Sequence, residues 1–442
     1  MNTIIGMVLV LGVIILVHEW GHFIVARFFG VRVDVFSIGF GPRLFGIKRG
    51  ATDWRVSALP LGGYVRMAGQ DISDIDSGEQ APTGSPDELM SKKRWQRAVI
   101  SFAGPAVNLL FPIVLLGGYY LISGVPYMKF ERDPVVVNQF SAAHTSAVNG
   151  LEAGDKIVSL NGMKNPTWEQ ALKIMSQTNP GEALSLDVEN SGTARHLNVV
   201  VPNDPWAHVL GYFPIAPVIG GVVAGLPASQ GGLQRGDLVR SVDGQRVDYW
   251  DQFVDEVRNS GGKTLQVEVE RKGQQSVKLM ITPKQGLGDA TDKRYQIGVG
   301  PRSDIEHVGA GGAVHAAAAR TGLYVVETFA ILRKLLSGQL SVKQLQSVVG
   351  ISRAAGHAVA EGAAAVIDFM VLISVNLGIL NLLPIPILDG GHILLLSMEG
   401  IRRRDFSLRF KERFIQVGLV FLLVLFAYVM YNDVVRLLPS HS

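Results

Sequence analysis

The sequence predicts a polytopic α-helical membrane protein with four transmembrane helices, a membrane-associated β-hairpin or sheet, and two small α+β domains. Three observations support this fold class. Hydrophobic residues make up 48% of the 442 residues, and the mean hydropathy is +0.25. Four apolar stretches, near residues 3–27, 98–123, 364–396 and 414–432, reach the ~20 residues that a helix needs to cross a bilayer. The long segment between the second and third stretches carries an internal repeat.

Composition excludes several function classes. The formal net charge of +3 is small and no basic cluster is large, so the chain is not expected to bind nucleic acid. The sequence has no cysteine, which rules out disulfides and thiolate metal sites. Histidine and carboxylate side chains remain as the candidate metal ligands.

The first element, residues 1–30, is a predicted transmembrane helix that contains VHEWGH at 17–22. Ionisable side chains inside a bilayer cost free energy and mark functional sites. His18 and His22 are four residues apart, so they project from one face of a helix, with Glu19 beside them. Because H-E-x-x-H on a helix provides two zinc ligands and a general base, we expect a zinc site within the membrane.

Residues 31–97 form a predicted cytoplasmic, membrane-associated β region followed by a loop. Within it, VRVDVFSIGFGPRLFG and TDWRVSALPLGGYVRM alternate and turn as strands do. Residues 98–123 then form the second predicted transmembrane helix, which includes AGPAVN at 103–108.

Two copies of one pattern occupy residues 124–212 and 213–303. GLEAGDKIVSLNG at 150–162 matches GLQRGDLVRSVDG at 232–244, with the Gly-Asp pair and the final glycine offset by 82 residues. In each copy a hairpin signal precedes a helical stretch and alternating strands. This order resembles tandem PDZ domains, which bind extended peptides by adding a strand to a sheet edge. Structural spacers without a ligand are the alternative.

Residues 304–362 are a predicted amphipathic helical connector. Its apolar part, near 314–336, contains Arg320, Glu327, Arg333 and Lys334. We therefore expect this part to lie on a surface instead of crossing the membrane.

The third predicted transmembrane helix, residues 363–398, is interrupted by Pro384 and Pro386. A catalytic zinc ion usually has three protein ligands, and this region offers four candidates for the third: Asp368, Asp389, His392 and Glu399. We expect Asp389, because the prolines before it and Gly390-Gly391 after it predict a break in the helix. Broken helices at membrane depth are tolerated where they line a cavity or are buried in protein.

Residues 399–413 form a predicted cytoplasmic basic loop, and residues 414–434 form the fourth transmembrane helix. Arginine and lysine are concentrated in this loop and in the segment after the first helix. The positive-inside rule makes both segments cytoplasmic, so both termini and the segment 124–363 lie outside, in the periplasm of a bacterium. The first and third helices then run in the same direction, which brings HEWGH and Asp389 to similar depths nearer the cytoplasmic face.

HEWGH, AGPAVN, the stretch NLLPIPILDGGH at 381–392 and the PDZ-like repeats together resemble the site-2 protease family of intramembrane zinc metalloproteases. The resemblance covers essentially the full chain. It implies a Zn²⁺ cofactor held by His18, His22 and Asp389, with Glu19 as the catalytic base. It also implies that Asn381 is a catalytic polar group that contacts substrate.

The same resemblance implies a substrate class and a location. The enzyme would lie in a bacterial inner membrane and cleave the transmembrane segment of a single-span protein, such as an anti-sigma factor. Cleavage would follow an earlier site-1 cut, in the regulated intramembrane proteolysis of an envelope stress response. Signal-peptide remnants are further candidate substrates.

A substrate helix must unwind before its peptide bonds can be cut, and an unwound strand in lipid needs new hydrogen-bond partners. We expect one edge of the β region to bind that strand, through six residues: Gly62, Gly63, Tyr64, Val65, Arg66 and Met67. A simple hairpin lying on the membrane is the alternative.

Two other function classes remain as alternatives, a membrane metal transporter and a non-catalytic PDZ scaffold. Glu19 and the tandem repeats speak against transport, because a transporter needs neither. The intact H-E-x-x-H motif, with Asp389 at a matching depth, speaks against a scaffold.

Overall fold

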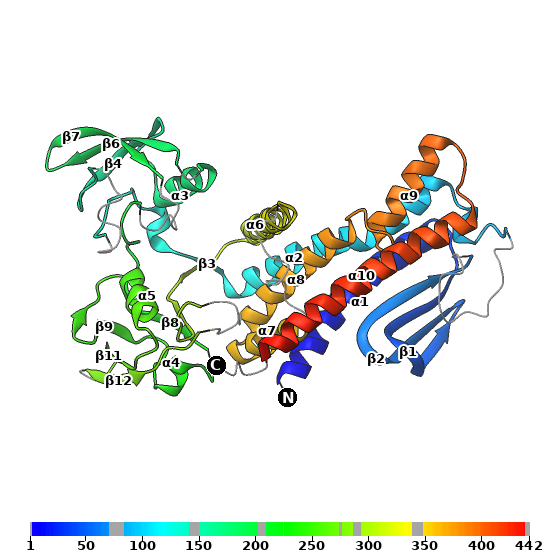
Figure 1. Cartoon of the computed structure of the whole chain (residues 1–442), viewed down its shortest axis with the longest axis horizontal. Coiled ribbons are helices and arrows are strands. Elements are labelled where there is room, and N and C mark those ends of the chain that lie inside the picture. Colours follow the sequence, from blue (N-terminus) through cyan, green and yellow to red (C-terminus); the bar gives the residue numbers. More distant parts are fainter. Residues whose placement is uncertain are drawn as a thin grey trace. The chain divides into compact units, whose positions relative to one another are not determined.

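The chain divides into two compact units, Met1–Gly124 with His307–Ser442, and Val125–Glu306. The computed structural model describes residues 2–69, 84–140, 150–179, 181–201, 209–223, 225–273, 276–285, 293–337 and 348–437. Among these residues the first unit holds the long helices and one sheet, and the second holds several small sheets (Figure 1).

Four helices of the first unit are long and apolar enough to cross a membrane. The candidate spans are Gly6–Phe28, Arg94–Ser123, Ala363–Asn381 and Arg409–Tyr431, with mean hydropathies of 2.1 to 2.3. They lie in helices α1 (Asn2–Phe28), α2 (Arg94–Ser123), α8 (Ala363–Asn381) and α10 (Leu408–Leu437). An α-helix satisfies its own backbone hydrogen bonds, which is what an apolar segment in lipid requires. Within the described residues, four helices are thus long and apolar enough to cross a membrane, as predicted.

The third predicted transmembrane helix, 363–398, is not one continuous helix. Helix α8 ends at Asn381, and a new helix, α9 (Asp389–Arg402), begins after seven intervening residues. Pro384 and Pro386 lie in this break, where each lacks the N–H that would continue the helix. Ile387 has a left-handed backbone with φ 82°, which also turns the chain.

The basic loop predicted at 399–413 is shorter in the structure. Residues 399–402 complete α9 and α10 begins at Leu408, so only residues 403–407 lie between the two helices. Positive charge marks the end of an apolar span, but arginine and lysine are also good helix formers. The charges therefore did not mark the ends of the helices.

The predicted connector 304–362 contains two helices, α6 (Ala310–Leu336) and α7 (Val348–Glu361). Helix α6 contacts α2 and α8 and crosses them steeply, since Figure 1 views α6 almost along its axis. Helix α7 packs on α1, where Ala355 joins a buried cluster with Val10 and Ile14. Residues 304–306 do not belong to the connector, because they form strand β14 (Asp304–Glu306), which pairs with β3 (Val125–Tyr127) in the second unit.

Strands β1 (Val33–Arg49) and β2 (Thr52–Met67) form the sheet of the first unit, beside α1 (Figure 1). Val35 pairs with both Arg66 and Asp53. Residues 35–38 of β1 therefore pair with the end of β2 on one side and with its beginning on the other. Residues 63–67 form an edge of the sheet. Val65 and Met67 point toward a core that they share with Ala26 of α1.

The second unit contains two four-stranded sheets with the same order, β5-β4-β6-β7 and β10-β9-β11-β12. The strands of the first are β4 (Lys156–Leu160), β5 (Met163–Lys164), β6 (Ala183–Asn190) and β7 (Thr193–Val200). Those of the second are β9 (Leu238–Val242), β10 (Gln245–Arg246), β11 (Leu265–Glu270) and β12 (Val277–Ile281). Helices α3 (Trp168–Gln177) and α5 (Trp250–Asn259) occupy the same place in the two copies, between the second and third strands.

The remaining elements are short. They are strands β8 (Ile219–Val222) and β13 (Val299–Pro301), which pair with each other, helix α4 (Pro227–Gln230), and the 3₁₀ turns η1 (Leu89–Ser91) and η2 (Lys129–Arg132).

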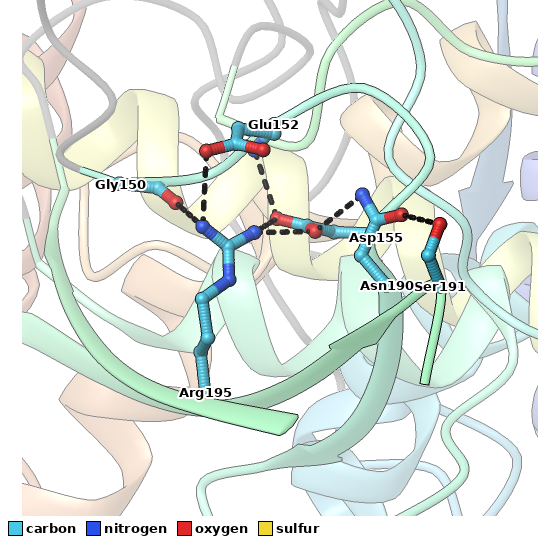
Figure 2. A network of polar contacts seen from close by, with 6 residues as sticks. All are labelled: Gly150, Glu152, Asp155, Asn190, Ser191 and Arg195. Carbon is cyan, nitrogen blue, oxygen red and sulfur yellow. Dashed lines mark hydrogen bonds and ion pairs between the residues drawn. The ribbon is translucent and has the colours of Figure 1, made fainter. Parts of the chain in front are cut away.

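The aspartate of each Gly-Asp pair is buried, and Figure 2 shows the polar network around the first of them, Asp155. Asp155 accepts hydrogen bonds from the backbone N–H of Glu152 at 2.8 Å and from Nη2 of Arg195 at 2.6 and 2.7 Å. Nη1 of Arg195 also donates to the carbonyl of Gly150 at 3.1 Å. A buried carboxylate requires such partners.

The second copy repeats this network. Asp237 accepts from the backbone N–H of Gln234 at 2.9 Å, and Arg271 donates to both Asp237 and the carbonyl of Gly232. The duplication seen in the sequence is therefore also a duplication of contacts.

Candidate metal centre

Helix α1 brings the two histidines of HEWGH together. His18 and His22 are 7% and 8% exposed, and their Nε2 atoms lie 3.2 Å apart. The i, i+4 spacing puts both imidazoles on one helix face.

Asp389, the first residue of α9, completes a group of three. Its carboxylate oxygens lie 3.3 Å from Nε2 of His18 and 3.4 Å from Nε2 of His22. In the described part of the chain, these three residues form a group of possible metal ligands. Their ligand atoms all lie within 4.8 Å of one another. Around a tetrahedral zinc ion with bonds of about 2.0–2.2 Å, neighbouring ligand atoms lie about 3.3 Å apart. The donor set and its spacing fit zinc.

The imidazole of His22 is oriented by the backbone of α2. Its Nδ1 lies 2.8 Å from the carbonyl oxygen of Ile100. A carbonyl can only accept, so Nδ1 carries a proton, and Nε2 is the nitrogen left to bind a metal beside His18 and Asp389. A ligand histidine in proteins almost always has such a partner on its other nitrogen.

Asn108 of α2 provides the corresponding partner for His18. Its amide lies 3.2 Å from Nδ1 of His18, and its side chain is fully buried. As oriented, the amide nitrogen faces the ring, and Oδ1 has no hydrogen-bond partner among the described residues. The two ends of an amide are assigned from the hydrogen-bond network. Turning the amide by 180° lets Oδ1 accept the N–H of Nδ1, and this leaves Nε2 of His18 free to bind a metal.

Two glycines allow α1 and α2 to approach closely at the site. A Cβ at Gly104 would lie 2.3 Å from Nε2 of His22, and one at Gly21 would lie 2.6 Å from the carbonyl oxygen of Ala103. Any side chain at Gly104 would fill the space of the ligand nitrogens.

Glu19 lies beside the edge of the sheet and is not one of the three clustered donors. A Cβ at Gly63 would be 3.4 Å from Cγ of Glu19, and the backbone of Val65 hydrogen bonds to the Glu19 carboxylate. The H-E-x-x-H helix and the strand 63–67 thus meet at this carboxylate.

Asn381, the last residue of α8, reaches the same centre. Its Nδ2 lies 3.4 Å from Nε2 of His18. The break between α8 and α9 therefore has the N–H donor of Asn381 at its beginning and the carboxylate of Asp389 at its end, and both lie at this centre.

The family assignment rests on a match along nearly the whole chain. A family model described as peptidase family M50 matches residues 6–425. The chain belongs to peptidase family M50. It is a zinc metalloprotease of the site-2 type, so the predicted family and class of enzyme are confirmed.

Three relatives of this M50 peptidase match it end to end. It is 31% identical to "Protease RseP" of Yersinia pestis, covering 98% of this chain and 99% of the relative. It is 32% identical to "Regulator of sigma-E protease RseP" of Escherichia coli, covering 97% and 98%. It is 30% identical to a "Putative zinc metalloprotease" of Vibrio cholerae, covering 98% of each.

A structural comparison matches the PDZ domain of an SdrC-like protein from Listeria monocytogenes at 21% identity with a TM-score of 0.17. The match covers 20% of this chain and 88% of that domain. This TM-score is too low to assign a fold.

The other polar candidates of the third span lie outside the metal centre of the M50 peptidase. Asp368 accepts hydrogen bonds from Tyr324 at 2.7 Å and from Arg320. Glu399 is fully buried and forms an ion pair with Lys411 at 3.1 Å. His392 is exposed and is not one of the three clustered donors.

The six residues expected to bind a substrate strand are the last six residues of β2. Alternation puts Val65 and Met67 in the core, while the hydroxyl of Tyr64 accepts a hydrogen bond from Arg55. Arg66 pairs with Val35, and Gly63 pairs with Ile38. Gly62 has φ 159°, which is nearly extended. A role in substrate binding stays a prediction.

Sequence reasoning missed Asn108 and Gly104 as parts of the site. Both belong to AGPAVN, which was noted only as a motif of the family. An asparagine inside a transmembrane helix was the available signal, because a polar side chain there needs a partner.

Proposed function

We propose that this protein is an intramembrane endopeptidase that cleaves single-span membrane proteins within or near the bilayer. One observation carries the proposal. His18, His22 and Asp389 gather in a cluster, and Glu19 lies beside the sheet edge 63–67. The helix that carries Glu19 is itself a candidate membrane span.

His18, His22 and Asp389 would hold the zinc ion. When bound, zinc acts as a Lewis acid and makes water a nucleophile near neutral pH. Ile100 and Asn108 would keep both ligand nitrogens deprotonated.

Glu19 would take the proton from the attacking water and pass it to the leaving nitrogen. Such general acid–base catalysis contributes ~10²–10⁴-fold in rate. Nδ2 of Asn381 would donate to the oxygen of the scissile carbonyl as charge develops on it. Losing one donor of this kind typically costs ~10²–10³-fold.

The edge formed by Gly62, Gly63, Tyr64, Val65, Arg66 and Met67 would bind the unwound substrate as an added strand. Residues 63–67 pair with β1 on one side only, and strand addition supplies main-chain hydrogen bonds that lipid cannot. The contact between this edge and Glu19 supports placing the substrate strand here.

The substrate would be an anti-sigma-factor-like protein, cut after a site-1 cleavage in the regulated intramembrane proteolysis of an envelope stress response. Signal-peptide remnants are further candidates. Support comes from the relative in Escherichia coli that is named a regulator of sigma-E protease.

The positive charges around α1 and α10 support a location in a bacterial inner membrane. Both termini and the two PDZ-like domains would be periplasmic, and the metal centre would lie nearer the cytoplasmic side. The PDZ-like domains would then restrict access and take no part in the chemistry.

The test uses the purified full chain and an already trimmed single-span substrate, with products mapped by mass spectrometry. We expect cleavage that a chelator stops and added zinc restores. Glu19→Gln should keep its zinc and lose about 10²–10⁴-fold in cleavage rate. Undiminished cleavage by Glu19→Gln would remove Glu19 from the mechanism, and zinc flux into liposomes without any proteolysis would favour a transporter.

A further inference from the structure

A basic pocket lies where α2 begins, far from the metal centre. It has a volume of about 700 Å³ and is lined by the chain entering α2, by α9 and by the loop after α9. Its polar lining includes Lys92, Lys93, Arg94, Arg97 and Asp405. Gly400 of α9 also lines it and lies eleven residues after Asp389, which is about 16 Å along a helix.

The pocket lies at the boundary of the membrane-spanning segments. The candidate spans of α2 and α10 begin at Arg94 and Arg409, and α9 ends at Arg402. Lipid headgroups occupy this level of a bilayer.

The acids of the pocket already have cationic partners. Nε and Nη2 of Arg94 donate to Oδ1 of Asp405 at 2.9 and 2.7 Å. Behind the pocket, the buried Glu399 pairs with Lys411 at 3.1 Å, and Nη2 of Arg97 lies 3.9 Å from it.

Two cationic groups remain available to a ligand. Lys92 and Lys93 line the pocket, and within the described residues neither side chain forms an ion pair. Arg97 is only 7% exposed and lies beside Glu399, so it adds positive charge behind the pocket without facing a ligand.

An apolar stripe leads from the pocket along α2. Trp95, Val99 and Phe102 are 57%, 41% and 47% exposed, and their spacing puts them on one helix face. Tryptophan is enriched at the level of the headgroups, and the stripe below it suits an acyl chain.

We propose that this pocket binds the phosphate of an anionic phospholipid. Lys92 and Lys93 bind the phosphate, and the acyl chains follow the stripe that begins at Trp95. Basic pockets between transmembrane helices bind lipid headgroups elsewhere. The site is separate from the proteolytic centre, and the proposal does not depend on the substrate.

The experiment measures lipid retention by the full chain in a neutral detergent, using native mass spectrometry. Phosphatidylglycerol and phosphatidylcholine are titrated at equal concentrations, because both have a phosphate and only the first has a net charge. We expect preferential retention of one phosphatidylglycerol. The double variant Lys92→Gln/Lys93→Gln should weaken this binding about 30-fold, which corresponds to about 1 kcal/mol per lysine.

Matched variants separate a pocket from general surface attraction. Arg403→Gln/Arg404→Gln removes the same charge from exposed positions that do not line the pocket, and it should retain the lipid as the unmodified chain does. Lys92→Arg/Lys93→Arg should restore binding, which also controls for damage to the fold.

Three results would overturn the proposal. They are equal retention of the two lipids, equal losses in the two glutamine variants, and displacement of phosphatidylglycerol by an equal concentration of inorganic phosphate. The last would assign the pocket to a free phosphate instead of a lipid.

Discussion

Replacing Asn108 by alanine tests how the metal centre is oriented. Asn108 is fully buried, and its amide is the group on Nδ1 of His18. In Asn108→Ala, a proton on Nδ1 would be buried without an acceptor, which costs about 1–3 kcal/mol. Moving that proton to Nε2 instead would block the nitrogen that binds zinc. Either outcome should weaken zinc binding by about 10–100-fold, the usual effect of losing such a partner.

The assay is a competition between the apo protein and a chelator of known zinc affinity, so it does not depend on proteolysis. Ser374→Ala is the matched control. Ser374 is equally buried and donates to the backbone oxygen of Asn108 at 2.8 Å. Its loss removes a buried hydrogen bond on the same residue without touching the ring of His18, so zinc affinity should stay within a few-fold.

Asn108→Asp distinguishes the two orientations of the amide. A carboxylate can only accept, so it can replace Oδ1 and keep Nε2 of His18 free for zinc. We expect this variant to hold zinc far better than Asn108→Ala. An unchanged zinc affinity in Asn108→Ala would refute the orienting role. A loss in Asn108→Asp as large as in Asn108→Ala would show that the amide nitrogen faces the ring.

The parts of the site that the sequence predicts are those fixed by local geometry. The spacing of His18 and His22 determines their common face on any helix. The prolines before Asp389 predict a break in the chain, and the structure has one between Asn381 and Asp389. The four apolar helices follow from length and hydropathy alone.

The parts that the sequence could not predict depend on contacts between distant segments. Asn108 meets His18 across ninety residues, and no spacing rule connects the two. The buried Glu399 pairs with Lys411, which belongs to a different helix. Local hydropathy does not reveal such a pairing, because it reports the neighbours in sequence and not those in space.

The same limit applies in the second unit. The repeat offset located Asp155 and Asp237, but their partners Arg195 and Arg271 lie at a different offset. A comparison at one fixed offset therefore finds the buried acids of the two copies and misses the cations that pair with them.

Three further predictions concern the metal, the sheet edge and the second unit. Asp389→Ala should lose most of its zinc and activity, whereas His392→Ala should keep both in large part, since His392 is exposed and outside the cluster; metal analysis of both variants decides this. Gly63→Ala would put a Cβ 2.8 Å from the carbonyl oxygen of Ser37, so the cleavage rate should fall while zinc affinity stays unchanged. Gly12→Ala is its control, because a Cβ there meets no described atom within 4 Å. Deleting about residues 127–300 should allow cleavage of substrates that still carry large periplasmic portions, if the PDZ-like domains restrict access. A folded outer domain can exclude a bulky substrate without touching the metal centre, so the deleted chain should also keep its rate on trimmed substrates. Loss of the cleavage rate on trimmed substrates would instead give the second unit a structural role.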